Sequence, residues 1–549
     1  MSKKAVAVLL VLIILFLTGC ASGRGDNADY PSSSSDSEAY YKSDNDASGE
    51  ISKKAEEAPW LPEVDSSYEI YNYDDEDYNI RENNNEKYTW INENREESTD
   101  FESMLTLSLK VDTASYSNIQ RYINNRTLPP VDAVRVEEMI NYFNYDAELT
   151  QKEGPFYTYS EVGPSPFDPE KLMVFLRVKT EDIKTSDLPP SHLVFLIDTS
   201  GSMASHDKLP LLKESLVMLV DSLEEKDIVS IVTYAGDARV VLTAESGSNK
   251  NSIIKAINRL SAGGSTAGSA GITTAYEIAA RYFVKNGNNR VILATDGDFN
   301  VGISSIEELE RFISKKRESG VNLSILGFGT GNIREDIMET LAKNGNGNYN
   351  YINEIKTAHK VLIEELGSNL YTVARDVKAQ VEFNPENVKN YRLIGYENRL
   401  LDNSDFNDDR KDAGEIGAGS DVIIMFEIEL NETPGGYKYS SGQSSPYNKS
   451  KYWNELFELR IRYKAINEDK SRLIVRTTTF NDVRSKNSPD YVFACAVASF
   501  GHILRDSTYS IYITPEDVLK MAESARGADV LGYRYEFINL VKEYVRITR

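Results

Sequence analysis

Cysteine and histidine are scarce in this 549-residue chain. The two cysteines, Cys20 and Cys495, are too few for a disulfide-framed secreted fold or a cysteine-rich zinc site. Only four histidines occur, which argues against a metal site built from imidazoles. The 61 lysines and arginines are outnumbered by 85 acidic residues, and the net charge is −24. Because nucleic-acid binding needs clustered positive charge, we expect no nucleic-acid partner.

The acidity is concentrated near the N-terminus. Residues 21–100 contain 22 acidic and 7 basic residues, are rich in Ser, Asn and Tyr, and show no sustained helical or strand period. Such a segment cannot bury enough apolar surface to offset its ordering entropy, and its like charges extend it. We therefore expect residues 20–100 to be a disordered acidic tether. Its tyrosines leave open the alternative of a partner-binding stretch.

Residues 1–19 have the pattern of an export signal. Two lysines precede 13 unbroken apolar residues, too short a run to cross a bilayer, which takes about 20 residues. The run ends in Leu17-Thr18-Gly19-Cys20, which resembles the bacterial lipobox. The resemblance implies that Cys20 becomes the acylated first residue, bearing palmitate, of an extracytoplasmic lipoprotein in a bacterial cell envelope. An ordinary cleaved signal or a short anchor is the alternative. Cys495, in an apolar stretch, is expected to be a buried thiol.

Strand-like and helix-like segments alternate between residues 191 and 370. Residues 193–197 and 291–295 are continuous apolar runs, as in strands buried on both faces. Further strands are expected at 228–234, 239–242, 321–327 and 349–352. Helices are expected at 209–223, 253–260, 271–283, 306–316 and 357–366. This alternation predicts an α/β fold with a doubly wound, mostly parallel sheet, in which ligands bind beyond the C-terminal strand ends.

Oxygen-bearing side chains follow two of these strands. Asp198-Thr199-Ser200-Gly201-Ser202 follows the first run, Asp296-Gly297-Asp298 follows the second, and a Gly/Ser/Thr loop between them contains Thr266. Oxygen ligands select hard cations, and two carboxylates with three hydroxyls suit Mg²⁺ better than Ca²⁺, with Mn²⁺ also compatible. Neutral hydroxyls leave the cation electron-poor and one position open. A partner protein's Asp or Glu carboxylate can fill that position.

The set Asp198, Ser200, Ser202, Thr266 and Asp296 resembles the metal-ion-dependent adhesion site of von Willebrand factor type A (VWA) domains, and all five positions match. The resemblance implies that the Ser and Thr hydroxyls contact the metal directly and that at least one Asp acts through water. Taken singly, each residue also has a simpler interpretation. Asp198 or Ser202 could cap the following helix, and the loop glycines could be ordinary turn residues.

The flanking regions predict a second architecture. Strand-like segments at 156–162 and 172–178 precede the central domain, and others at 373–383, 388–396, 421–430, 456–463 and 473–480 follow it. We expect them to form one β-sandwich into which the VWA domain is inserted. Helices are expected at 128–138, 490–505, 514–526 and 534–546, the third with Thr514 as N-cap before Pro515.

The whole layout resembles a bacterial family of VWA lipoproteins. It comprises a signal peptide (1–19), a tether (20–100), an N-terminal conserved region (101–190), a VWA domain (191–370), a β-rich region (371–485) and C-terminal helices (486–549). The resemblance implies a fold and a metal site and no settled biochemical role.

The sequence is compatible with three functions. The leading one is a membrane-anchored envelope lipoprotein that binds a protein partner through a Mg²⁺-bridged acidic residue. The alternative is an envelope assembly or stress-response scaffold without an adhesive role. The remote alternative is a haloacid-dehalogenase-like phosphotransferase, which needs a second Asp two residues after the first. Ser200 stands there after Asp198, and Asp296-Gly297-Asp298 is followed by Asn300 where Thr or Val is expected. We therefore expect no enzymatic activity.

Overall fold

The computed structural model describes most of the chain from residue 85 onward. The described residues are 85–110, 112–147, 149, 151–184, 187–264, 269–297, 305–411, 413–431, 451–466 and 468–549. They lie within one compact unit, Asn79–Arg549. The expected signal peptide, Cys20 and residues 20–84 of the expected tether fall outside them.

The last part of the expected tether is folded. Strand β1 (Glu97–Ser98) pairs antiparallel with a strand almost 300 residues later, and Glu86 forms an ion pair of 2.8 Å with Arg121. The backbone of Asn85 also donates to Gly331 O. The prediction of a tether reaching residue 100 is therefore wrong for residues 85–100. Composition alone missed these contacts because their partners lie far along the chain.

The central domain contains a six-stranded sheet in the order β11-β10-β9-β6-β7-β8. All neighbours are parallel except β8, which runs antiparallel to β7. Its strands are β6 (Ser191–Asp198), β7 (Ile228–Ala235), β8 (Asp237–Ser246), β9 (Asn288–Thr295), β10 (Val321–Phe328) and β11 (Tyr349–Ile352). Every residue of β6 and β9 is buried, as their apolar runs predict.

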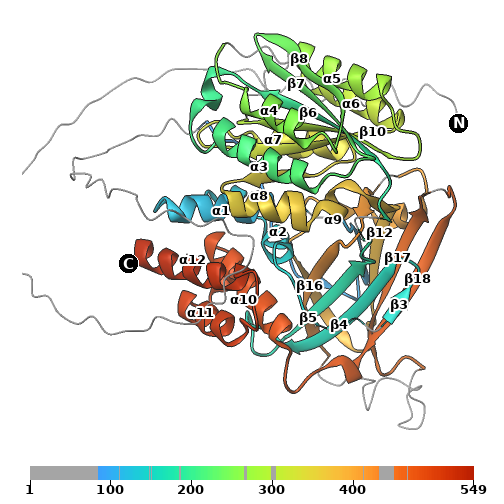
Figure 1. The fold of residues 1–549 in the computed structure, drawn as a ribbon. Helices are drawn as coiled ribbons and strands as arrows, with labels where there is room; N and C mark the ends of the chain where they lie inside the picture. Colours follow the sequence, from blue (N-terminus) through green and yellow to red (C-terminus); the bar gives the residue numbers. More distant parts are fainter. Residues whose placement is uncertain are drawn as a thin grey trace, which may run out of the picture. The chain divides into compact units, whose positions relative to one another are not determined.

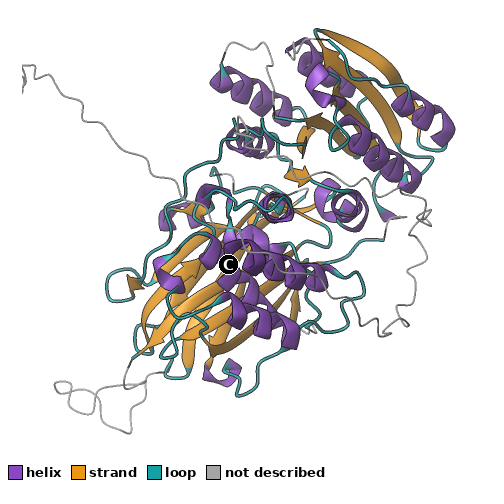
Figure 2. Cartoon of the chain, turned by 90° about the vertical axis from the view of Figure 1, so that its left-hand side faces the viewer, coloured by secondary structure: helices purple, strands orange, loops and turns teal. Residues whose placement is uncertain are grey.

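Helices cover both faces of this sheet (Figures 1 and 2). One apolar core lies under α3, α4 and α8, and another lies under α5, α6 and α7. The helices are α3 (Leu209–Ser222), α4 (Lys250–Asn258), α5 (Ser269–Arg281), α6 (Ile306–Glu318), α7 (Glu335–Asn344), α8 (Ile355–His359), the π-helix η4 (Lys360–Glu364) and α9 (Leu366–Leu370). The predicted α/β doubly wound fold is confirmed.

Three local predictions for this domain differ from the structure. Strand β8 has ten residues, whereas only four were expected. The single closing helix expected at 357–366 is divided among α8, the π-helix η4 and α9. Helix α7 was not expected, because its short apolar pattern lies between glycine-rich stretches that indicate loops.

Two antiparallel sheets build the sandwich, in the orders β1-β13-β16-β5-β4-β3 and β14-β2-β12-β17-β18, with β15 paired to β12. Both sheets combine strands from before and after the central domain, which is inserted between β5 and β12 as predicted. The strands are β2 (Met104–Ser108), β3 (Gln151–Glu153), β4 (Phe156–Pro164), β5 (Leu172–Thr180), β12 (Thr372–Phe383), β13 (Val388–Ile394), β14 (Leu400–Leu401), β15 (Glu415–Gly417), β16 (Asp421–Leu430), β17 (Glu455–Ala465) and β18 (Ser471–Thr479).

N- and C-terminal helices share one core against the outer face of the first sheet. They are α1 (Ala114–Asn124), α2 (Val136–Asn141), α10 (Pro489–Leu504), α11 (Pro515–Ser524) and α12 (Tyr533–Thr548). Cys495 is a buried free thiol in α10, as predicted, and burial raises its pKa to about 12. Thr514 caps α11 in a full capping box.

The helix predicted at 128–138 is instead a short 3₁₀ turn, Val131–Ala133, followed by α2. Val134 and Arg135 are extended and separate the two. Among the residues that the structure describes, no helix has the length and apolarity needed to span a bilayer.

Candidate functional site

Asp198 ends β6 at the centre of the parallel sheet, and its side chain is fully buried. Its Oδ1 accepts a hydrogen bond of 2.8 Å from the backbone N–H of Ser200. Its Oδ2 is buried and has no hydrogen-bond partner of normal geometry among the described residues. Burial raises the pKa of Asp198 to about 6, with a further rise from Asp296 and opposition from the bonds of Ser200. The Tyr234 hydroxyl also interacts with this carboxylate and opposes the rise. A buried oxygen without a well-formed hydrogen bond is costly, and a bound cation would satisfy it.

Ser200 and Ser202 follow in the same loop. The Ser200 backbone is extended, and a 3₁₀ turn (Gly201–Ala204) then carries Ser202 back toward it. Their two Oγ atoms lie 2.9 Å apart, with Ser200 buried and Ser202 exposed. Two neutral oxygens therefore lie together at the edge of the sheet, one on the side of the protein interior and one on the side of the solvent.

Asp296 follows β9, the parallel neighbour of β6, and is fully buried. The register pairs Ile197 with Ala294, so Asp198 and Asp296 emerge at the same edge of the sheet. Gly297 forms the turn that follows, with φ of +99°, and a Cβ there would lie 2.2 Å from Asn332 O. Only glycine fits this turn, which fixes the position of Asp296.

A lysine at this site was not predicted from the sequence. Lys208 Nζ donates to Asp296 Oδ2 at 2.9 Å, and its side chain is only 10% exposed. The lysine stem passes over Gly329, where a Cβ would lie 2.2 Å from Lys208 Cε. The site therefore contains a built-in positive charge beside one of its two carboxylates. The sequence held no local signal for it, because the partners are 88 residues apart.

The start of the predicted glycine-rich loop lies beside the Asp198 loop. Gly201 N donates to Gly264 O at 3.2 Å, and Gly263 N donates to Thr199 O at 2.8 Å. Thr266 and Asp298 lie outside the described residues. The structure thus brings together Asp198, Ser200, Ser202 and Asp296, which are four of the five predicted ligands.

The donor set fits a hard divalent cation. Its ligands are two carboxylates and two hydroxyls, all oxygen, at one end of a parallel sheet. No group of three or more His, Cys, Asp or Glu side chains suited to a metal ion occurs in the described ranges. Such a site would hold Mg²⁺, Mn²⁺ or Ca²⁺ with only two negatively charged ligands, and Lys208 already offsets the charge of one of them, Asp296.

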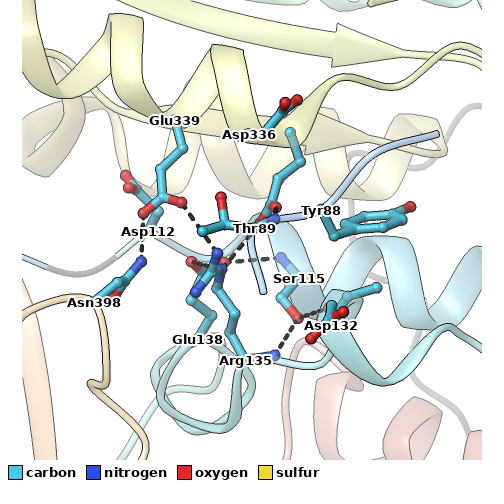
Figure 3. Close-up of polar contacts among 12 residues, drawn as sticks. Tyr88, Thr89, Asp112, Ser115, Asp132, Arg135, Glu138, Asp336, Glu339 and Asn398 are labelled. Atoms are coloured by element: carbon cyan, nitrogen blue, oxygen red, sulfur yellow. Dashed lines mark hydrogen bonds and ion pairs between the residues drawn. The ribbon is translucent and has the colours of Figure 1, made fainter. Parts of the chain in front are cut away.

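A second buried polar cluster surrounds Arg135 (Figure 3). Arg135 Nε is 3.0 Å from Glu335 Oε1, and its Nη2 is 3.3 Å from Glu339 Oε2. Glu138 Oε1 is 3.9 Å from the same guanidinium. Because Glu335 and Glu339 belong to α7, one arginine joins the N-terminal region to the central domain.

The segment Asp112-Thr113-Ala114-Ser115, which superficially echoes the metal motif, belongs to this cluster. Asp112 Oδ2 accepts a bond of 2.8 Å from Arg399 Nη2, and Ser115 Oγ donates to Ala133 O at 2.7 Å. The Ser115 backbone N–H donates to Glu138 Oε2. The Asp112 and Ser115 side chains are therefore used in internal contacts.

Three family models match the chain. The von Willebrand factor type A domain model matches residues 192–364, a model described as von Willebrand factor matches residues 82–175, and the model of the C-terminal part of uncharacterized protein YfbK matches residues 368–547. Uncharacterized protein YfbK of Escherichia coli (strain K12) is 44% identical over 447 residues, which cover 80% of this chain and 77% of that protein.

Solved structures resemble the chain at lower identity. A von Willebrand factor type A protein from Catenulispora acidiphila is 15% identical, with 70% of this chain and 91% of that chain covered and a TM-score of 0.38. Proximal thread matrix protein 1 from the mussel byssus, described with a zinc-occupied metal-ion-dependent adhesion site, is 23% identical, with 34% and 46% covered and a TM-score of 0.28.

Proposed function

The chain belongs to the family of uncharacterized protein YfbK and contains a VWA domain, and from this premise we propose that it binds a protein partner through a divalent cation, most suitably Mg²⁺, at the Asp198 site. VWA domains typically bind protein ligands. The observation that carries the proposal is the convergence of two fully buried carboxylates, Asp198 and Asp296, with paired serine hydroxyls at the end of the parallel sheet.

Each residue has a separate task in this proposal. Asp198 supplies negative charge and a buried oxygen, Oδ2, that has no hydrogen bond of normal geometry among the described residues. Ser200 and Ser202 supply neutral oxygens, and Thr266 is the fifth ligand expected from the sequence. A bound divalent cation supplies the positive charge that an acidic side chain of the partner needs. Asp296 supplies a second carboxylate, and its pair with Lys208 keeps the net charge of the site low.

The test compares metal binding with partner capture. Mg²⁺ is titrated calorimetrically into the purified full-length protein and its Asp198→Asn variant, which keeps the shape of the side chain. Intact cells are then crosslinked with Mg²⁺ or with EDTA. We expect Asp198→Asn to abolish Mg²⁺ binding and the Mg²⁺-dependent crosslink while the circular dichroism spectrum is unchanged.

The matched control is Asp221→Asn, an exposed aspartate at the far end of α3. It removes the same charge and should leave both measurements at the wild-type level. Capture of the same partner in EDTA, or by Asp198→Asn, would contradict the proposal.

We further propose that the protein is anchored to a bacterial membrane, outside the cytoplasm, by acylation of Cys20. The lipobox-like sequence Leu17-Thr18-Gly19-Cys20 after a short apolar run supports this. Cells fed an alkyne-labelled palmitate should label the wild type and not Cys20→Ser, whereas Cys495→Ser should label normally. Equal labelling of the two serine variants would rule out Cys20 as the anchor.

A further inference from the structure

A cavity of about 430 Å³ lies between β8 and α4, directly beside the metal-site residues. One end of its wall is formed by Thr199, which follows Asp198, and by Gly263, which bonds to Thr199. Its size is in the range of small-ligand sites, roughly 300 to 1,000 Å³. Because Thr199 and Gly263 belong both to the cavity wall and to the loops beside Asp198, a chain segment bound at Asp198 can continue into this groove.

The groove has a positive rim in a strongly acidic protein. Asp237, Arg239 and Val241 of β8 line the cavity. Arg259, at the C-terminal end of α4, lines the opposite side. Both arginines are exposed, and neither makes an ion pair with any residue in the described ranges. Two guanidiniums with one carboxylate give a local positive charge, although the whole chain carries −24.

The floor of the groove is apolar, and hydrogen bonds from α3 hold the side of its rim that α4 forms. Val241, Ala256 and Leu260, all partly buried, line it together with the arginines. Lys213 on α3 donates to the carbonyls of Asn258 and Leu260, at 2.9 and 3.2 Å, and so ties down the end of α4 that presents Arg259.

We propose that this groove binds a second acidic residue of the same partner segment whose first carboxylate reaches the cation at Asp198. The occupant is an extended acidic segment of a partner protein, with an apolar side chain between its two acids. Charge complementarity supports this occupant, since the guanidinium fork matches a carboxylate in shape and charge. The inference rests on the proposed function and makes it more specific: Arg239 and Arg259 select partners with two acids over partners with one.

The experiment uses full-length protein and fluorescent peptides in the presence of Mg²⁺. One peptide series has two glutamates separated by one to three valines, and the other has glutamine in place of the second glutamate. For the wild type we expect the best two-acid peptide to bind about tenfold more tightly than its one-acid counterpart. In Arg239→Gln/Arg259→Gln this preference should disappear, with the affinity for the one-acid peptide and for Mg²⁺ unchanged.

The control variant, Arg281→Gln/Lys285→Gln, removes two exposed positive charges at and beyond the end of α5, on the opposite face of the sheet, and should keep the preference. Equal binding of both peptide series by the wild type, or a preference that survives in Arg239→Gln/Arg259→Gln, would overturn the groove proposal while leaving the metal site intact. If neither series binds in Mg²⁺, or if both bind equally in EDTA, the proposed function fails and this inference fails with it.

Discussion

Arg135 Nε lies 3.0 Å from Glu335 Oε1, and the two side chains are only 1% and 8% exposed. This ion pair joins residues 200 positions apart, from the N-terminal region and from α7 of the VWA domain. Glu339 and Glu138 share the same guanidinium. The VWA domain is therefore held to the rest of the protein by a buried charge cluster that contains none of the predicted metal ligands.

Removing Arg135 should be strongly destabilising. Arg135→Met leaves Glu335 and Glu138 buried without their shared counter-charge, whereas Glu339 keeps its pair with Arg399 at 3.1 Å. Breaking a buried pair in this way costs about 3–5 kcal/mol. We expect a loss of this size in the free energy of unfolding, measured by urea denaturation of the full-length protein.

The neighbouring Arg334 offers a matched control. It pairs with Asp336 on the surface, where both side chains are 31% exposed. Arg334→Met should cost under about 1 kcal/mol, because exposed pairs contribute little. Equal losses for the two variants would mean that the buried cluster does not stabilise the junction.

The same cluster should make stability depend on pH. Burial and the neighbouring Glu339 raise the pKa of Glu335 from 4.5 to about 7, although Arg135 opposes the shift. Between these values the folded protein keeps a proton that the unfolded chain has lost. The stabilising contribution of this group is therefore complete below pH 4.5 and is lost as pH rises to about 7.

Glu335→Gln should remove the part of this pH dependence that Glu335 contributes. Burial also raises the pKa values of Glu137 and Glu138, and both remain in the variant. Relative to the variant, the wild type should lose about 2–3 kcal/mol of unfolding free energy between pH 4.5 and pH 8. Burial lowers the pKa of His192 to about 4 and also lowers that of His502, which gives the opposite trend near pH 6. The contributions of His192 and His502 are the same in both proteins, so they cancel when the unfolding free energy of the variant is subtracted from that of the wild type. Glu318→Gln, at an exposed helix end, should leave the pH curve unchanged.

The fold could be predicted where local patterns determine it. The buried runs of β6 and β9, the alternating sandwich strands and the Thr514 cap all act over a few residues, and the structure contains each of them. Strand β2 was missed because five residues give a weak signal and its partner strand β12 lies about 270 residues later.

The candidate site was predictable only in part for the same reason. Asp198, Ser200, Ser202 and Asp296 follow strands in a short pattern, so the sequence places them together. The pair between Lys208 and Asp296, the buried Arg135 cluster and the groove with Arg239 and Arg259 all depend on which elements become neighbours in space. No local period or spacing specifies those contacts.

Lys208 should tune the metal site. Its ammonium group stabilises the buried Asp296 in the cation-free protein and repels a divalent cation nearby. Lys208→Met should therefore lower the stability of the metal-free protein by about 3–5 kcal/mol. The same variant should bind Mg²⁺ more tightly than the wild type, so that added Mg²⁺ raises its melting temperature by a larger amount.

Calorimetric titration and thermal unfolding with and without Mg²⁺ measure both effects. Lys226→Met, which removes a partly exposed lysine paired with Glu224, should change neither. Weaker Mg²⁺ binding by Lys208→Met would show that the lysine supports the cation instead of competing with it.

Gly329 provides an independent way to move the same lysine. Its φ is +74°, and a Cβ would lie 2.2–2.8 Å from three carbons of the Lys208 stem. Gly329→Ala should therefore displace the ammonium from Asp296 while keeping its charge in the protein, at an additional cost for the left-handed backbone of about 1–2 kcal/mol. If competition at Asp296 controls the site, Gly329→Ala should bind Mg²⁺ more tightly, as Lys208→Met does, and the double variant should bind no more tightly than Lys208→Met alone.

Gly331→Ala, also at positive φ but with no atom within 4 Å of its Cβ, should be destabilised by strain with unchanged Mg²⁺ affinity. Additive gains in the double variant would mean that Gly329 acts on the site by a route other than Lys208.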